Sequence, residues 1–105
     1  MGTTKHHTII VTGVDEAINR AHDAATSTFK ELVSPIIKSK MNGYMSFFIA
    51  PDGSKEGWKD SNEYDDKRKN YIAWLEDEIN ELGNYLDYAE ICYSSDIIPN
   101  ILNHS

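Results

Sequence analysis

The pattern of apolar and polar positions along the chain predicts four strands and two helices. Residues 6–12, HHTIIVT, are rich in β-branched side chains and end at Gly13, which predicts a first strand. From Asp15, apolar residues recur at three- and four-residue steps as far as Leu32, which predicts a helix that Pro35 stops. The apolar stripe of this helix consists of Ala17, Ile18, Ala21, Ala25, Phe29 and Leu32.

The remaining pattern predicts a hairpin, a long helix and a last strand. Two extended runs flank Asn42-Gly43, a pair that suits a type I′ turn because both central residues need a positive φ. A second helix is predicted from Asp60 to Gly83, where a glycine can end it in the left-handed conformation. Its apolar face carries Tyr64, Tyr71, Ile72, Leu75, Ile79 and Leu82. Residues 87–94 alternate sufficiently to predict the last strand.

This order of elements predicts an α+β domain with the ferredoxin-like βαββαβ sandwich, in which two helices cover one face of a four-stranded antiparallel sheet. Alternation along the strands sends two sets of side chains to opposite faces. The set expected under the helices is Ile9, Val11, Met45, Phe47 and Ile49. The set expected on the open face is Ile10, Tyr44 and Phe48, with Cys92 as a further candidate. An apolar aromatic patch on an open sheet indicates a partner, so we expect Ile10, Tyr44 and Phe48 to form a homodimer interface.

Length and composition fit one small domain. The 105 residues, of which 40% are hydrophobic, suffice for a single core, and we expect one domain over 1–105 with frayed ends at about 1–5 and 99–105. Cys92 is the only cysteine, which excludes an intrachain disulfide and a zinc ribbon. Because the sequence has no signal-peptide pattern and no long apolar run, we expect a cytoplasmic protein that does not enter membranes.

The formal net charge of −7 argues against binding to DNA or RNA, since it repels phosphate backbones. An acidic surface can instead dock on a basic partner. The segment NGYMSFFIA is similar to the aromatic motif by which RNA-recognition domains stack bases, but the match needs one extra residue. Ile10 also stands where the first strand of such a domain would carry an aromatic residue. Ordinary sheet packing is therefore the favoured interpretation of this motif.

Residues 51–58, PDGSKEGW, form the best candidate for a ligand-binding loop. Ser54, Lys55 and free backbone N–H groups at the start of the second helix are suited to a phosphate or carboxylate, and Trp58 to stacking on a base. In the alternative interpretation, Trp58 closes the end of the core and the two glycines only turn the chain. We favour the alternative, in which the loop is a structural corner.

Candidates for catalysis and metal binding are weak. His6 and His7 are adjacent, so on a strand they point to opposite faces and cannot chelate one metal ion together. The acidic runs of the second helix lie opposite its apolar stripe, which is typical of a solvated face. No nucleophile motif, P-loop or zinc motif occurs. We therefore expect no catalytic residues, no metal, no cofactor and no enzymatic activity.

The segments HHTIIVTG, VSPIIKSKMNGYMSFFIAPDGSKEGW and DDKRKNYIAWL resemble a family of small bacteriophage proteins of uncharacterised activity. The resemblance covers most of residues 6–75 and is most specific in PDGSKEGW. It transfers no catalytic or binding residue, because the family has no established activity. It implies an accessory viral protein that acts in the cytoplasm of the infected bacterium by stoichiometric binding.

Together these patterns lead us to expect a noncatalytic phage accessory protein. Its target would be a host or defence protein, which it inhibits, or a small nucleotide signal, which it sequesters. The alternatives are a small nucleotide-processing enzyme or an RNA-binding module on the same fold, and a virion component.

Overall fold

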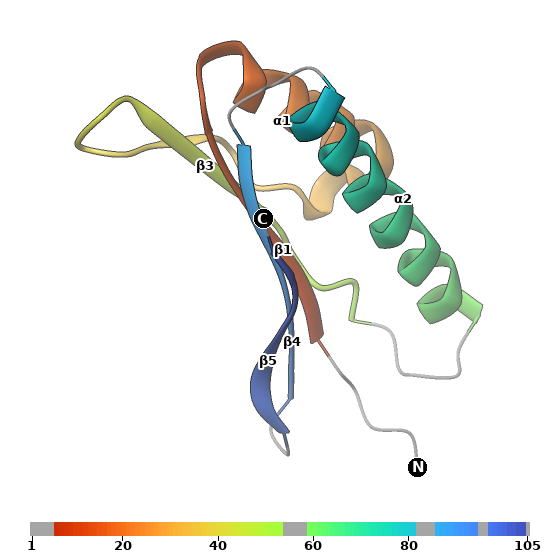
Figure 1. Ribbon diagram of the computed structural model, residues 1–105. Coiled ribbons are helices and arrows are strands. Elements are labelled where there is room, and N and C mark those ends of the chain that lie inside the picture. Colours follow the sequence, from red (N-terminus) through yellow and green to blue (C-terminus); the bar gives the residue numbers. More distant parts are fainter. Residues whose placement is uncertain (1–5, 54–58, 82–85, 95–96, 105) are drawn as a thin grey trace.

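The computed structural model describes residues 6–53, 59–81, 86–94 and 97–104, which form an antiparallel sheet and two long helices. The elements are β1 (His6–Val14), α1 (Asp15–Phe29), the 3-10 turn η1 (Lys30–Leu32), β2 (Ile37–Lys38), β3 (Tyr44–Ile49), α2 (Lys59–Glu81), β4 (Leu86–Ser94) and β5 (Ile97–His104). Figure 1 shows both helices on the same side of the sheet, so that the other side is open. The predicted α+β class is confirmed.

The sheet has five strands in the order β2-β3-β1-β4-β5, and every pair is antiparallel. The sequence predicted only four strands, with a frayed end from about residue 99. The structure instead pairs β5 with β4, for example His104 with Ala89. A proline has no N–H to donate to a neighbouring strand, but an edge strand such as β5 tolerates Pro99. The tail therefore extends the sheet at its β4 edge.

The core lies between the sheet and the two helices. The fully buried side chains of β1 and β3 are those that alternation assigned to the helices, such as Ile9, Val11 and Phe47, whereas Met45 is half-buried. They pack against the apolar stripes of both helices. The core residues are Ile9, Val11, Ala17, Ile18, Ala21, Ala25, Phe29, Phe47, Ile49, Tyr71, Leu75, Leu86 and Tyr88.

Helix α1 ends earlier than its apolar pattern predicted. The pattern extends to Leu32, but the helix ends at Phe29 because Lys30 adopts a positive φ of 53°. The chain then continues as the turn η1 and runs along β3, where Ser34 N donates to Phe48 O at 2.9 Å. The residues before Pro35 are thus tied to the sheet rather than to the helix.

The turn between β2 and β3 has the predicted conformation. Asn42 and Gly43 both have positive φ, 64° and 69°, as a type I′ turn requires. Ser39 N donates to Tyr44 O at 2.8 Å and closes the hairpin. Figure 1 shows this hairpin extending beyond the rest of the sheet.

Among the described helices, none is long and apolar enough to cross a membrane.

Candidate functional site

The open face of the sheet is the candidate site, and Ile10 is at its centre. In register, Ile10 lies opposite Phe48 on β3 and opposite Ala89 on β4, so the three side chains form a row across the strands. Ile10 and Phe48 remain 40% and 44% exposed, which is high for large apolar residues in a sheet. The third residue of the predicted interface, Tyr44, is half-buried at the far end of β3, opposite Val14. The structure therefore brings two of the three predicted residues together.

Two shallow hollows flank Ile10 on this face. The larger one, of about 310 Å³, lies toward β3 and the loop that follows it, and its lining includes Ile10, Ile37, Phe48, Pro51 and Tyr93. The smaller one, of about 220 Å³, lies toward β4 and is lined by Ile10, Thr12, Asp87, Tyr88 and Ala89. The face is therefore uneven, with a bulky side chain on one side of Ile10 and a small one on the other.

The open face is almost without charge. Among the described side chains of β1, β3 and β4 that share this face, Asp87 is the only Asp, Glu, Lys or Arg. Polar character comes instead from hydroxyl groups, and the Oγ atoms of Thr12 and Ser46 lie 2.8 Å apart in a hydrogen bond. Such a face can offer apolar contacts and a few hydrogen bonds rather than ion pairs.

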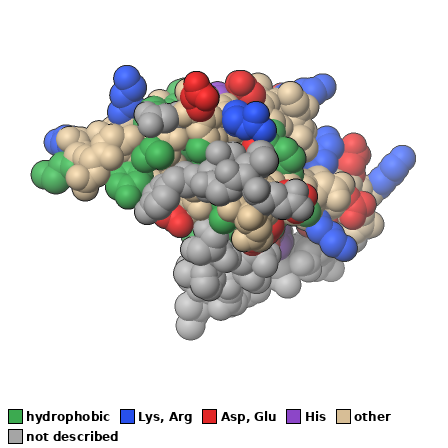
Figure 2. Space-filling view, turned by 45° about the horizontal axis from the view of Figure 1, so that its top comes forward, with side chains coloured by type: hydrophobic (Ala, Val, Ile, Leu, Met, Phe, Trp, Pro, Cys, Tyr) green, Lys and Arg blue, Asp and Glu red, His purple; other side chains and the backbone are tan. Residues whose placement is uncertain are grey.

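The charged side chains lie mainly on the helical layer. Exposed acidic residues there are Glu16, Asp23, Glu63, Asp65, Asp66 and Asp77. Figure 2 shows charged side chains over the helical side of the molecule, while hydrophobic side chains gather toward the hairpin. The described surface is thus divided into a charged helical layer and a nearly uncharged sheet face.

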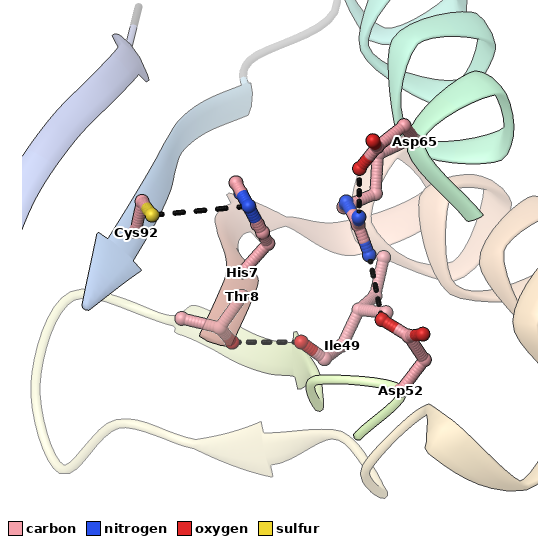
Figure 3. Close-up of polar contacts among 7 residues, drawn as sticks. His7, Thr8, Ile49, Asp52, Asp65 and Cys92 are labelled. Atoms are coloured by element: carbon pink, nitrogen blue, oxygen red, sulfur yellow. Dashed lines mark hydrogen bonds and ion pairs between the residues drawn. The ribbon is translucent and has the colours of Figure 1, made fainter. Parts of the chain in front are cut away.

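Cys92 does not belong to the open face. The prediction that placed it there is wrong, because Cys92 lies opposite His7 in register and His7 is on the same side of β1 as Ile9. Its Sγ lies 3.8 Å from His7 Nε2 (Figure 3). His6 points to the opposite side, with its ring centroid 5.2 Å from that of Tyr93. Within the described residues, no three His, Cys, Asp or Glu side chains form a group that could hold a metal ion.

The predicted ligand loop begins as a fixed corner. Ser54, Lys55 and Trp58 lie outside the described residues, but Asp52 is described, and its Oδ1 lies 3.2 Å from Nη1 of Arg68 on α2. Arg68 also pairs with Asp65 (Figure 3). A nearly buried arginine holds the described start of the loop, Pro51 to Gly53, against α2.

Sequence reasoning missed Arg68 and also Glu78, which is buried on the same helix. Both residues occupy positions of the apolar stripe of α2. A charged residue at such a position could have predicted a buried ion pair. The carboxylate of Glu78 lies 2.8 Å from Nη2 of Arg20 and thereby links the two helices. The ion pairs of Arg68 and Glu78 compensate for burying these two charged groups at the edge of the core.

Two buried tyrosines complete the polar contacts of the core. Tyr71 OH donates to Ala21 O at 2.7 Å, and burial raises the pKa of this phenol. Tyr88 OH donates to a carboxylate oxygen of Glu76. The pKa of the Tyr88 phenol is raised mainly by burial and further by this hydrogen bond. Both phenols are therefore protonated donors at neutral pH, with a structural role.

The open face offers apolar contacts, two hollows and hydroxyl groups, which is the chemistry of protein recognition. Comparisons with protein-family models, with curated proteins and with solved structures find no match to this chain. No residue role can therefore be transferred from a relative.

Proposed function

We propose that this chain is a noncatalytic binding protein of a bacteriophage, which acts in the cytoplasm of the infected bacterium by inhibiting a host or defence protein. The observation that carries the proposal is the division of the described surface into a nearly uncharged sheet face and a charged helical layer. The phage origin rests on the resemblance of residues 6–75 to small phage proteins.

The two surfaces have different tasks in this proposal. The open face, with Ile10 and Phe48, is the surface for apolar association with another protein chain, because exposed apolar residues of this size gain most from losing water contact, whereas the host target binds to the helical layer. The acidic helical layer stays outside and attracts the basic surface of the target. Attraction between opposite charges speeds association and weakens with salt.

The proposed fold is the ferredoxin-like sandwich with a fifth strand added at its C-terminal end. The strand order β2-β3-β1-β4 and the position of both helices on one face support this assignment. In such a sandwich the uncovered sheet face is the natural docking surface, in agreement with the exposed pair Ile10 and Phe48.

Capture from a lysate of infected bacteria tests the function. We expect the tagged protein to retain one host protein at a stoichiometric ratio, identified by mass spectrometry and released by raising the salt concentration. The double substitution Asp66→Lys and Asp77→Lys reverses two exposed charges of α2 and should abolish retention. The matched control Lys69→Ala, also exposed on α2, should not weaken it.

The same experiment distinguishes the competing targets. A nucleotide released by heating, and lost with Lys55→Ala or Trp58→Ala, would replace the protein target by a nucleotide signal. Consumption of a nucleotide by the purified chain, with or without a divalent metal ion, would contradict a noncatalytic role. Retention that is unchanged by the charge reversal would remove the helical layer from the proposal.

A further inference from the structure

The row Phe48, Ile10 and Ala89 gives the open face a shape that can match itself. The three residues lie at the same level on β3, β1 and β4, with the largest side chain on one side of Ile10 and the smallest on the other. Phe48 is 44% exposed, and Ala89 helps to line the smaller hollow. A large exposed side chain and a small side chain at equal distances from a central residue are complementary to each other about a two-fold axis at that residue.

We propose that a second copy of this chain packs on the open face, about a two-fold axis that runs parallel to the strands beside Ile10. This inference rests on the proposed function in one respect, namely that the open face is a binding surface. Two sheets would then face each other about 10 Å apart, as in aligned sheet packing, with the helical layers outside.

The direction of the axis follows from the side-chain sizes. An axis parallel to the strands places Phe48 of each copy over Ala89 of the other, and Ile10 against Ile10. An axis perpendicular to the strands, in the plane between the sheets, would place Phe48 against Phe48 and leave both alanines facing a gap. Large side chains pack best against small ones across an interface, so the parallel axis is preferred.

The few polar groups of the face agree with the same axis. One level along from Ile10 lie Ser46 on β3, Thr12 on β1 and Asp87 on β4. The parallel axis places Asp87 of one copy opposite the Ser46 hydroxyl of the other. Because Thr12 and Ser46 share one hydrogen bond, one of the two hydroxyl hydrogens remains to be donated to that carboxylate. The single described charge of β1, β3 and β4 on this face thus gains a partner.

Charge also favours a second copy over a nucleic acid. The chain carries a net charge of −7, so two copies repel each other at long range and approach best through surfaces without acidic residues. The open face is the surface closest to this description, because Asp87 is its single described acidic residue on β1, β3 and β4. On the described parts of β1, β3 and β4 it holds no Lys or Arg to contact phosphate groups. The dimer would display two acidic helical layers, one on each outer side.

An exchange of the large and small side chains tests this packing. Analytical ultracentrifugation should show a dimer for the wild type. Phe48→Ala removes the large exposed side chain, and Ala89→Phe fills the smaller hollow, so each should raise the dimer dissociation constant by about 30-fold or more. The double variant with Phe48→Ala and Ala89→Phe restores one large and one small residue on either side of Ile10, and should recover the dimer. Circular dichroism and thermal unfolding of each variant confirm that it is folded.

Three results would overturn the inference. They are a wild type that sediments as a monomer even near millimolar concentration, a dimer unaffected by Ala89→Phe, and a folded double variant that fails to recover the dimer. The proposed function is judged separately, by host-protein capture and its loss with Asp66→Lys and Asp77→Lys. A monomer that still captures the host protein therefore overturns the second copy alone, and a dimer that captures nothing overturns the proposed function alone.

Discussion

Arg68 and Asp52 form a buried ion pair between α2 and the loop that follows β3. Their side chains are only 5% and 9% exposed, and Arg68 Nη1 lies 3.2 Å from Asp52 Oδ1. Sixteen positions separate the two residues, so the contact exists only after the loop has returned to the helix. In the described part of the PDGSKEGW loop, Pro51, Asp52 and Gly53 therefore form a structural corner, which the ion pair with Arg68 holds against α2.

Removing the Asp52 carboxylate should destabilise the fold. Among the partners that the structure describes, Asp52→Asn leaves the nearly buried Arg68 with the exposed Asp65 carboxylate alone, and we expect a loss of about 2 kcal/mol in the free energy of unfolding. Asp65→Asn is the matched control, and because Asp65 is 55% exposed it should cost less than about 1 kcal/mol. Urea denaturation measures both. Equal losses would show that the pair with Asp52 has no special weight.

Phe47 and Phe48 are neighbours on opposite faces of β3, and truncating each to alanine should change the folding stability by different amounts. Phe47 is 1% exposed, and Phe47→Ala should cost about 3–5 kcal/mol of folding stability. Phe48→Ala should cost about 1 kcal/mol or less when measured at a protein concentration too low for association. If both substitutions destabilise alike in thermal or chemical unfolding, the open face is covered within the monomer.

The phenol of Tyr71 should make stability fall at high pH. Burial raises its folded-state pKa above the ordinary value of about 10, so the unfolded chain loses this proton first as the pH rises. The resulting stabilisation is complete below about pH 10 and is lost progressively above it. Tyr71→Phe should cost about 1 kcal/mol at neutral pH, through the lost hydrogen bond to Ala21 O, and should reduce the alkaline decline to the part that the raised pKa of Tyr88 contributes.

Tyr64→Phe provides the control for this pH dependence. Tyr64 lies on the same helix but is only half-buried, so its replacement should leave the alkaline decline unchanged. Urea denaturation at pH 7 and at pH values above 10 compares the two variants. A decline that persists in full with Tyr71→Phe would assign it to other groups.

Gly43 should be the sensitive position of the hairpin turn. Its φ is +69°, and a Cβ built there meets no atom within 4 Å, so any cost of Gly43→Ala is conformational rather than steric. We expect about 1 kcal/mol, since residues with a Cβ disfavour the left-handed region. Gly43→Asn should be better tolerated, because asparagine enters this region more readily. Thermal unfolding distinguishes them, and equal stability of the alanine variant would contradict a strained turn.

Local patterns predicted most of the elements, because each depends on neighbours in the chain. The turn at Asn42-Gly43 follows from backbone preferences of those two residues. The alternation of β1 placed Ile9 inside and Ile10 outside, since successive side chains of a strand point to opposite faces. The fifth strand escaped prediction because Pro99 is compatible with a strand only at an edge, and an edge is a property of the assembled sheet.

The sequence by itself determined the α+β class, the two amphipathic helices and which side of β1 and β3 is buried. These follow from periodicity, which the chain carries locally. Only the tertiary structure decided which residues meet across the strands. Register places Phe48 and Ala89 on either side of Ile10, moves Cys92 to the helical side, and returns Asp52 to Arg68. Such contacts depend on how distant segments align, because pairing one residue further along would exchange the two faces of a strand.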